Sequence, residues 1–208
     1  MQFELSSYLF RIDSEDKKAI KTLCAAFQDN GRMHALIGKN RNNFSKGIKA
    51  IISYCYFMVK KIGGIFKSKD QSTFLLFYQK SEHYFSFRDW LHYLYLAFFV
   101  IRVSRIGQVL KREKLIRKTR ALQIQKHQDR DFLYVWFLAQ KKDYNGLDGL
   151  MEAKEYITAK GATLNLPIYM ETTEERLVPI YERFGFEFYD YREDDSIDLR
   201  VWFGRCVA

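Results

Sequence analysis

The chain has 208 residues, of which 48% are hydrophobic and 17% aromatic, with only 2 Pro and 11 Gly. This apolar content excludes disorder over most of the chain, and the length suffices for a sizeable core in one large domain or two small ones. Three cysteines are too few for a disulfide scaffold, so a reducing cytoplasm is the expected location.

The net charge of +9 is divided unevenly along the chain. Residues 1–130 hold 25 Lys and Arg against 10 Asp and Glu, a balance of +15, whereas residues 131–208 hold 9 against 15, a balance of −6. A basic half could serve a polyanion or a phosphorylated cofactor, and an acidic half could serve a cationic substrate. Solvated faces explain the same counts equally well.

The N-terminus shows no targeting segment. It begins MQFELSSYLF, without a basic stretch followed by an apolar run, so no signal peptide is expected. The most apolar segment, Trp90 to Ile101, is too short to span a bilayer and is followed by Arg102. We therefore expect a soluble protein with no membrane span.

Helix signals dominate the N-terminal portion. Asp13 with Asp16 three residues on predicts a helix N-terminus, and the apolar residues that follow fall on one helical face. Ser45 predicts the cap of a second helix, which Gly63 and Gly64 end. The later elements expected here are two short strands, a third helix and a basic helix, at residues 65–66, 72–79, 86–103 and 109–123 in turn.

The last third of the chain is more regular. Residues 132–140 are rich in aromatic and branched side chains, as in a buried strand, and the polar loop KKDYNGLDG follows. The elements expected next are a helix, a strand, a short helix and a hairpin, at residues 150–160, 166–171, 172–182 and 186–205 in turn. This order predicts a mixed sheet with helices on its faces. Without repeats or linkers, residues 1–208 are expected to form one domain.

A strand that leads through a glycine-containing loop into a helix can bind phosphate. Free backbone N–H groups and the positive helix end both point at the anion. The residues NGLDG, 145–149, occupy that position. Many such turns bind nothing, so the loop alone is a weak signal.

The segments LYVWFLAQKKDYNGLDGLMEA and LPIYMETTEERLVPIYERFGFEFYDY resemble the GNAT superfamily of N-acyltransferases. The likeness covers residues 131–205, with YERFGF at 181–186 its most specific piece, and FSFRDWLHYLYLA and VLKREKLIRK resemble the helical insert of bacterial members. It implies an α/β fold with a mostly antiparallel mixed sheet of about six or seven strands, splayed between the fourth and fifth, with helices on both faces. The basic, helical portion 1–130 would then precede an acyl-CoA-binding and catalytic portion at 131–208.

The resemblance implies positions for acetyl-CoA, the acyl donor, and implies no metal. Backbone groups facing pantetheine and the thioester would come from Leu138, Ala139 and Gln140. The residues that would cradle the pyrophosphate are Asn145, Gly146, Leu147, Asp148, Gly149 and Leu150. The family loop usually reads Gln or Arg, two residues, Gly, one residue, then Gly or Ala. Here Asp148 and Leu150 stand at the small positions, and a carboxylate beside an anion costs on the order of 1 kcal/mol, which lowers the expected CoA affinity.

Acyl transfer to an amine requires a base, an N–H for the oxyanion and an acid for the departing thiolate. The oxyanion donor is expected near Leu138 or Ala139. Tyr181 matches the family's tyrosine before the Gly-Phe pair and is the expected general acid, with a packed core tyrosine as the alternative. Glu171, at the end of the fifth strand, is the candidate base or docking charge, and a solvated strand-end carboxylate is the slightly favoured alternative.

The favoured function is acetyl transfer from acetyl-CoA to a primary amine of a small molecule or peptide. The acidic Glu171, Glu174 and Glu175 favour a cationic acceptor. One alternative is a GNAT-fold binding protein that has lost CoA affinity, and another is a nucleic-acid-binding protein that uses residues 102–130. For that basic segment a solvated helix face is favoured, because it lacks aromatic interleaving, so nucleic acid is not an expected partner. The acceptor and the oligomeric state stay open, with a homodimer as one option.

Overall fold

The computed structural model of the chain describes residues 13–30, 33–34, 37, 41–82, 103–197 and 199–207. Within these ranges one sheet of six strands forms, in the order β1-β2-β3-β4-β6-β5. The strands are β1 (Ile65–Lys67), β2 (Thr73–Gln79), β3 (Leu133–Gln140), β4 (Ile168–Thr172), β5 (Glu187–Asp194) and β6 (Leu199–Cys206). Only β3 and β4 run parallel, and the other neighbours are antiparallel. The prediction of a mostly antiparallel mixed sheet is therefore confirmed.

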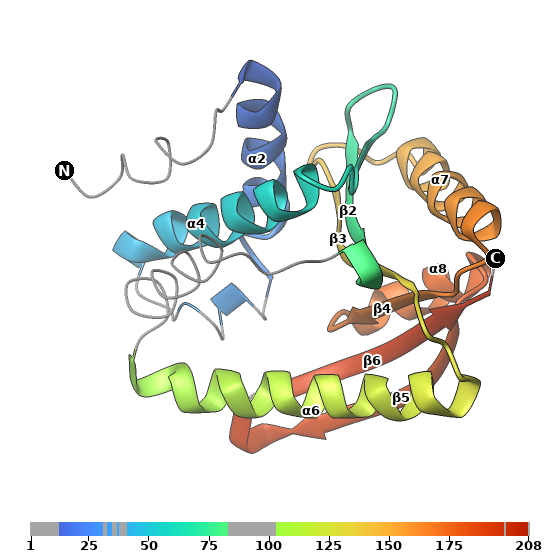
Figure 1. Cartoon of the computed structure of the whole chain (residues 1–208). Helices are drawn as coiled ribbons and strands as arrows, with labels where there is room; N and C mark the ends of the chain where they lie inside the picture. Colours follow the sequence, from blue (N-terminus) through green and yellow to red (C-terminus); the bar gives the residue numbers. More distant parts are fainter. Residues whose placement is uncertain are drawn as a thin grey trace.

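Helices cover both faces of the sheet (Figure 1). The helices are α2 (Ser14–Ala26), α4 (Arg41–Lys60), α6 (Val103–His127), α7 (Asp148–Leu164) and α8 (Val178–Arg183), and the short 3-10 turns are η1 (Lys80–Glu82), η3 (Glu175–Leu177) and η4 (Asp195–Ile197). One face packs against α2 and α4 at β2 and β3 and against α6 at β6, whereas α7 and α8 pack on the other face. The hydrophobic core is thus split into two layers by the sheet.

Local sequence signals explain where α2 begins. The Asp13 carboxylate accepts a 2.7 Å hydrogen bond from the Asp16 backbone N–H, and the Asp16 carboxylate accepts one from the Asp13 N–H at 3.2 Å, as the predicted cap requires. Asp16 is buried, and its carboxylate also binds Lys60 at 2.6 Å and the Tyr56 hydroxyl at 3.0 Å. This ion pair joins the start of α2 to the end of α4.

Two predicted helix starts differ from the observed ones, and one predicted helix cannot be compared. Ser45 was expected to cap the second helix, but α4 begins at Arg41, so that prediction is wrong and Ser45 lies inside the helix. The helix after the NGLDG loop starts at Asp148 rather than at residue 150. The helix expected at residues 86–103 lies outside the described residues, except for its last residue.

Strands β3 and β4 separate after three residue pairs, of which Val135 with Met170 is the last. The next residue, Trp136, is an extra residue in β3, because Leu76 pairs with Phe137 while Phe77 pairs with Val135. Such a bulge bends the strand and raises its twist. Residues 137–140 consequently pair with β2 alone. The splay expected between the fourth and fifth strands is the opening between β3 and β4, the third and fourth of the described strands.

Candidate active site

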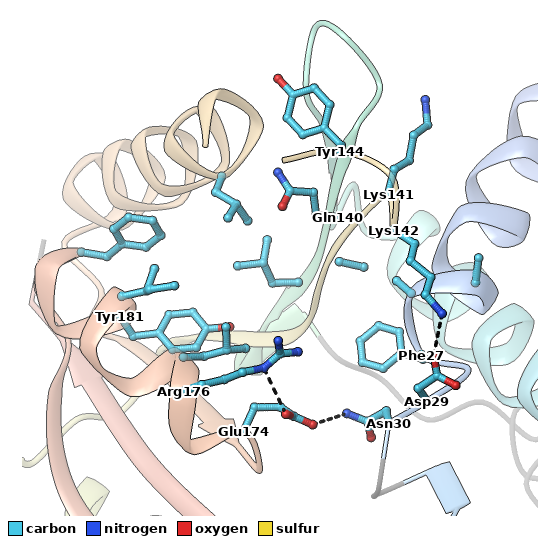
Figure 2. A pocket seen from close by; sticks show the side chains of 18 residues that line it. Phe27, Asp29, Asn30, Gln140, Lys141, Lys142, Tyr144, Glu174, Arg176 and Tyr181 are labelled. Carbon is cyan, nitrogen blue, oxygen red and sulfur yellow. Dashed lines mark hydrogen bonds and ion pairs between the residues drawn. The ribbon is translucent and has the colours of Figure 1, made fainter. Parts of the chain in front are cut away.

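A pocket of about 530 Å³ lies at the splayed end of β3 (Figure 2). Its walls come from the end of α2, the end of β3 and the following loop, the first turn of α7, and η3 with α8. The polar residues that line it are Asp29, Asn30, Gln140, Lys141, Lys142, Tyr144, Glu174, Arg176 and Tyr181. Its volume is in the range of pockets that bind small molecules and cofactors.

The turn that presents Tyr181 is built locally. The Thr172 hydroxyl accepts a hydrogen bond from the Glu174 N–H at 3.1 Å, which starts the turn after β4. Helix α8 follows with a proline in its first turn, and Gly185 ends it at φ +92°, a conformation that glycine adopts without strain. The Phe186 N–H then donates to the Tyr181 carbonyl at 3.0 Å. The YERFGF motif is thus a short helix and its glycine stop.

Tyr181 directs its hydroxyl into the pocket from α8 (Figure 2). The side chain is 8% exposed, and its ring meets those of Phe184 and Phe186 edge-on. Burial raises the pKa of Tyr181 to about 12. Within the described part of the chain the hydroxyl has no hydrogen-bond partner. It is therefore a protonated donor at neutral pH that a bound molecule can use.

The edge of β3 that faces this pocket has no partner strand beyond Val135. Leu138, Ala139 and Gln140, the residues expected to face pantetheine, all line the pocket. In an extended strand every second residue directs its N–H and C=O to the same edge, so unpaired backbone groups face the opening. These groups can bind an extended ligand chain or a developing oxyanion.

The loop after β3 is held in place by the turn between β1 and β2. The Lys141 N–H donates to the Ser72 carbonyl at 2.8 Å, and the Gln140 side-chain amide donates to the Gly146 carbonyl at 2.6 Å. A hydrogen bond from Tyr144 to Asp70 raises the pKa of the Tyr144 hydroxyl. The loop is thereby fixed against the sheet at both of its ends.

The six residues predicted to cradle a pyrophosphate divide into two groups. Leu150 lines the pocket, whereas residues 145–149 do not. Gly149 is buried, and a Cβ there would lie 2.4 Å from the Thr73 hydroxyl and 2.7 Å from that of Ser72. The absence of a side chain at Gly149 therefore allows α7 to pack on β2.

Positive charge in and near the pocket comes from other groups. Lys141, Lys142 and Arg176 line it, and the N-cap of α7, Leu147, provides no side-chain hydrogen bond to the first-turn N–H groups. The positive end of α7 is therefore open, although the exposed Asp148 lies in the same turn. Lys142 pairs with Asp29 at 2.7 Å, but both side chains are largely exposed, so this pair is weak.

Glu171 is not among the residues that line the pocket. Its side chain is 1% exposed and pairs with Arg120 of α6 at 3.0 Å. The Tyr134 hydroxyl donates to the other carboxylate oxygen, and the Arg120 guanidinium lies 4.4 Å from the centre of the Tyr134 ring. The interpretation as a solvated carboxylate is therefore wrong. A role as base stays a prediction, and this buried pairing counts against it.

The sequence did not reveal several members of the site. Asp29 and Asn30 follow α2 in a polar run, which indicates the end of a helix and not a pocket wall. Arg176 lies in an ordinary charged turn, and Arg120 is one cation in a basic helix. Within the described ranges, no group of three or more His, Cys, Asp or Glu side chains could hold a metal ion. Nor is any helix found there that is long and apolar enough to cross a membrane.

The sheet order, the opening after Val135 and the pocket beside it define a GNAT-type fold. A scan against protein-family models and a search of curated proteins find no match. Among solved structures, the histone acetyltransferase HPA2 and related acetyltransferase from Corynebacterium glutamicum is 15% identical, with a TM-score of 0.61 over 95% of this chain and 94% of that one.

Two further structures are similar over nearly the whole chain. The polyamine N-acetyltransferase of Drosophila melanogaster is 11% identical, with a TM-score of 0.60 over 95% of this chain and 97% of that one. The C-terminal condensation domain of Ebony, in complex with beta-alanyl-dopamine, is 7% identical, with a TM-score of 0.60 over 92% and 93% of the two chains. At such identities the likeness shows a shared fold.

Proposed function

We propose that the protein is an N-acetyltransferase that transfers an acetyl group from acetyl-CoA to a primary amine. The observation that carries the proposal is the Tyr181 hydroxyl, which shares one pocket with the unpaired edge of β3. A donor group and a free strand edge are what a thioester and its leaving group need. The likeness in fold to acetyltransferase structures supports the reaction class.

The pantetheine chain would lie along Leu138, Ala139 and Gln140, where a backbone N–H polarises the thioester carbonyl. The neutral amine attacks the carbonyl carbon, the C–N bond forms and the C–S bond breaks. Tyr181 donates its proton to the departing sulfur as that bond breaks, and the amine releases its own proton to solvent. A pKa of about 12 makes the hydroxyl a hydrogen-bond donor first and an acid only as charge develops on sulfur.

The cofactor phosphates would meet Lys141, Lys142 and the open N-terminus of α7. Asp148 opposes them from the same turn. A phosphate-free donor such as acetyl-pantetheine needs neither lysine, so its binding should not depend on Lys141 or Lys142.

The acceptor that we propose is a small cationic amine. Asp29 and Glu174 both line the pocket, and the Glu174 carboxylate meets Asn30 at 3.5 Å and Arg176 at 3.6 Å, both long contacts. We therefore propose Glu174 as the docking charge for the ammonium group, in place of Glu171. The likeness to structures named for agmatine and polyamine acetyltransferases supports this choice.

We place the reaction in the cytoplasm. The cysteines Cys24, Cys55 and Cys206 all carry free thiols, which suits a reducing compartment.

Ligand binding gives the first test. Acetyl-CoA at a hundred times its dissociation constant should stabilise the protein by about 2.7 kcal/mol, measured as a rise in Tm. The variant Lys141→Gln/Lys142→Gln should bind acetyl-CoA roughly tenfold more weakly and acetyl-pantetheine equally well. The matched control Lys17→Gln/Lys21→Gln removes the same charge from exposed positions of α2. No rise in Tm with millimolar acetyl-CoA would refute the proposal.

Turnover gives the second test. Release of free CoA thiol should follow addition of diamines or agmatine to the wild-type protein with acetyl-CoA. Glu174→Gln should raise KM for a dicationic amine more than for a monocationic one, since it removes a docking charge. Binding of acetyl-CoA without thiol release across a panel of primary amines would exclude the enzyme and leave a CoA-binding protein.

A further inference from the structure

The outer side of α6 carries exposed cations and no exposed acid. Toward the sheet the helix buries Ile116, Thr119 and Arg112. The exposed residues from 107 to 126 are Gly107, Gln108, Leu110, Lys111, Lys114, Arg117, Lys118, Ala121, Leu122, Gln125 and Lys126. The one acidic residue of the helix, Glu113, is not among them.

Four of these cations share one face of the helix. At about 3.6 residues per turn, Lys111, Lys114, Arg117 and Lys118 fall within an arc of roughly 120°. We call these four residues the basic face. Over this arc the helix presents a row of positive charges that extends about 10 Å along its axis.

Acids within the described ranges leave this charge uncompensated. No residue of the basic face forms an ion pair with a described residue. The nearby acids of β5 pair with arginines of the hairpin itself, Asp190 with Arg192 at 2.8 Å and Glu193 with Arg200 at 2.7 Å. A positive field therefore extends from the helix into solvent.

The basic face stands on a rigid support. Ile116 packs with Leu199 and Val201 of β6, and Arg120 is held by its ion pair with the buried Glu171 at 3.0 Å. Figure 1 shows α6 running along β5 and β6 on this side of the sheet. Because the helix backbone is already ordered, binding of a ligand costs little additional backbone entropy.

The composition of the surface distinguishes between polyanions. A membrane-binding helix needs a continuous apolar face, but the exposed Leu110 and Leu122 lie about 18 Å apart along the axis and roughly 120° apart around it. Unpaired bases would need aromatic side chains to stack on, and the exposed residues of α6 from 107 to 126 include none. Phosphates of a duplex backbone require only regularly spaced cations.

We propose that the basic face of α6 binds the phosphate backbone of double-stranded nucleic acid without preference for sequence. The proposal goes beyond acetyl transfer, since no residue of the basic face lines the pocket that holds Tyr181. The sequence alone indicated a solvated face, and the structure adds that these cations share one side of α6 and form no ion pair within the described ranges.

Fluorescence anisotropy with the full-length protein and a short labelled DNA duplex of mixed sequence tests the proposal. Neutralisation of four phosphates predicts that log K falls against log salt with a slope of about −3.6. The variant Lys111→Gln/Lys114→Gln/Lys118→Gln should lower that slope by about 2.7 and weaken binding at least roughly tenfold at low salt. A second duplex of unrelated sequence should bind equally well.

The matched control Lys17→Gln/Lys21→Gln/Lys49→Gln removes three exposed charges from α2 and α4. It should leave the slope and the affinity of the duplex nearly unchanged, and both variants should keep the wild-type Tm and acetyl-CoA binding. Equal loss in both variants, salt-independent binding or no binding would overturn the proposal. Binding to vesicles of phosphatidylserine and phosphatidylcholine that depends on the same lysines, without duplex binding, would overturn it as well.

Discussion

Arg120 and Glu171 form a buried ion pair of 3.0 Å that joins α6 to β4 at the point where the sheet opens. Met170 is the last residue of β4 that pairs with β3, and Glu171 follows it directly. The Tyr134 hydroxyl donates to the same carboxylate from the paired part of β3. The pair therefore connects α6 to both strands that border the opening.

Loss of Arg120 should destabilise the fold strongly. In Arg120→Met the Glu171 carboxylate stays buried at 1% exposure without its counter-charge, and such a loss costs about 3–5 kcal/mol. Urea unfolding of Arg120→Met measures this cost. The exposed pair of Lys142 and Asp29 is the control, since Asp29→Asn should cost less than about 1 kcal/mol. Equal costs for the two variants would show that Glu171 does not depend on Arg120.

The reaction should depend on the Tyr181 hydroxyl. Tyr181→Phe removes the proton donor and keeps the ring packed, so kcat should fall at least about a hundredfold while the Kd for acetyl-CoA stays within roughly twofold. Steady-state kinetics and calorimetry measure the two quantities. Tyr191→Phe is the control, because that hydroxyl is on an exposed side chain and binds Glu193. Wild-type kcat in Tyr181→Phe would remove Tyr181 from the mechanism.

Burial of Tyr181 should also appear in the pH dependence of stability. Its pKa is raised to about 12 in the folded protein, against about 10 in the unfolded chain. Between these values the unfolded state loses the proton and the folded state keeps it, so stability falls as pH rises. This contribution is fully present below pH of about 10. The free energy of unfolding should therefore fall less steeply in Tyr181→Phe from about pH 10 to 12, and identical slopes would contradict the shift.

Substitution of two glycines by alanine should have opposite effects on the stability of the protein. A Cβ at Gly149 would lie 2.4 Å from the Thr73 hydroxyl, so Gly149→Ala should cost about 1–3 kcal/mol and displace the start of α7. At Gly107, in α6, a Cβ would meet nothing within 4 Å, so Gly107→Ala should stabilise the protein by about 0.5–1 kcal/mol. Thermal unfolding compares the two variants. A stabilising Gly149→Ala would show that α7 does not pack this closely on β2.

Removal of the Asp148 charge should strengthen cofactor binding. Asp148→Asn takes a negative charge from the open end of α7, and an effect of about 0.3–1 kcal/mol corresponds to a roughly two- to fivefold lower Kd for acetyl-CoA. The same change should lower stability slightly, because the charge favours the helix end. Calorimetry with acetyl-CoA and with acetyl-pantetheine checks this. An equal gain for both donors would mean that the phosphates are not involved.

Much of the fold could be predicted from short segments. The capping box of Asp13 and Asp16 and the YERFGF turn are local, and both form where they were expected. The start of α4 could not be predicted, because Ser45 is a good cap residue that tertiary contacts overrode. The bulge at Trp136 has no sequence signal of its own, since it depends on the register between β2 and β3.

The candidate site was only partly predictable. Leu138, Ala139, Gln140, Leu150 and Tyr181 line the pocket from β3, α7 and α8, three elements that the sequence indicates in this order. Asp29, Asn30 and Arg176 come from segments far apart in the chain, and folding alone brings them to the same cavity.

Residue patterns by themselves determined the order of strands and helices, because periodicity records which side of each element is buried. Only the tertiary structure decided which charged side chains form buried ion pairs that stabilise the fold and which remain exposed to solvent. Arg120 and Lys118 are two similar cations in one basic stretch, but one is paired with a carboxylate 51 residues away and the other is exposed. That difference depends on where β4 lies beneath α6. A local pattern cannot encode it, because desolvation and pairing arise only when the two segments meet.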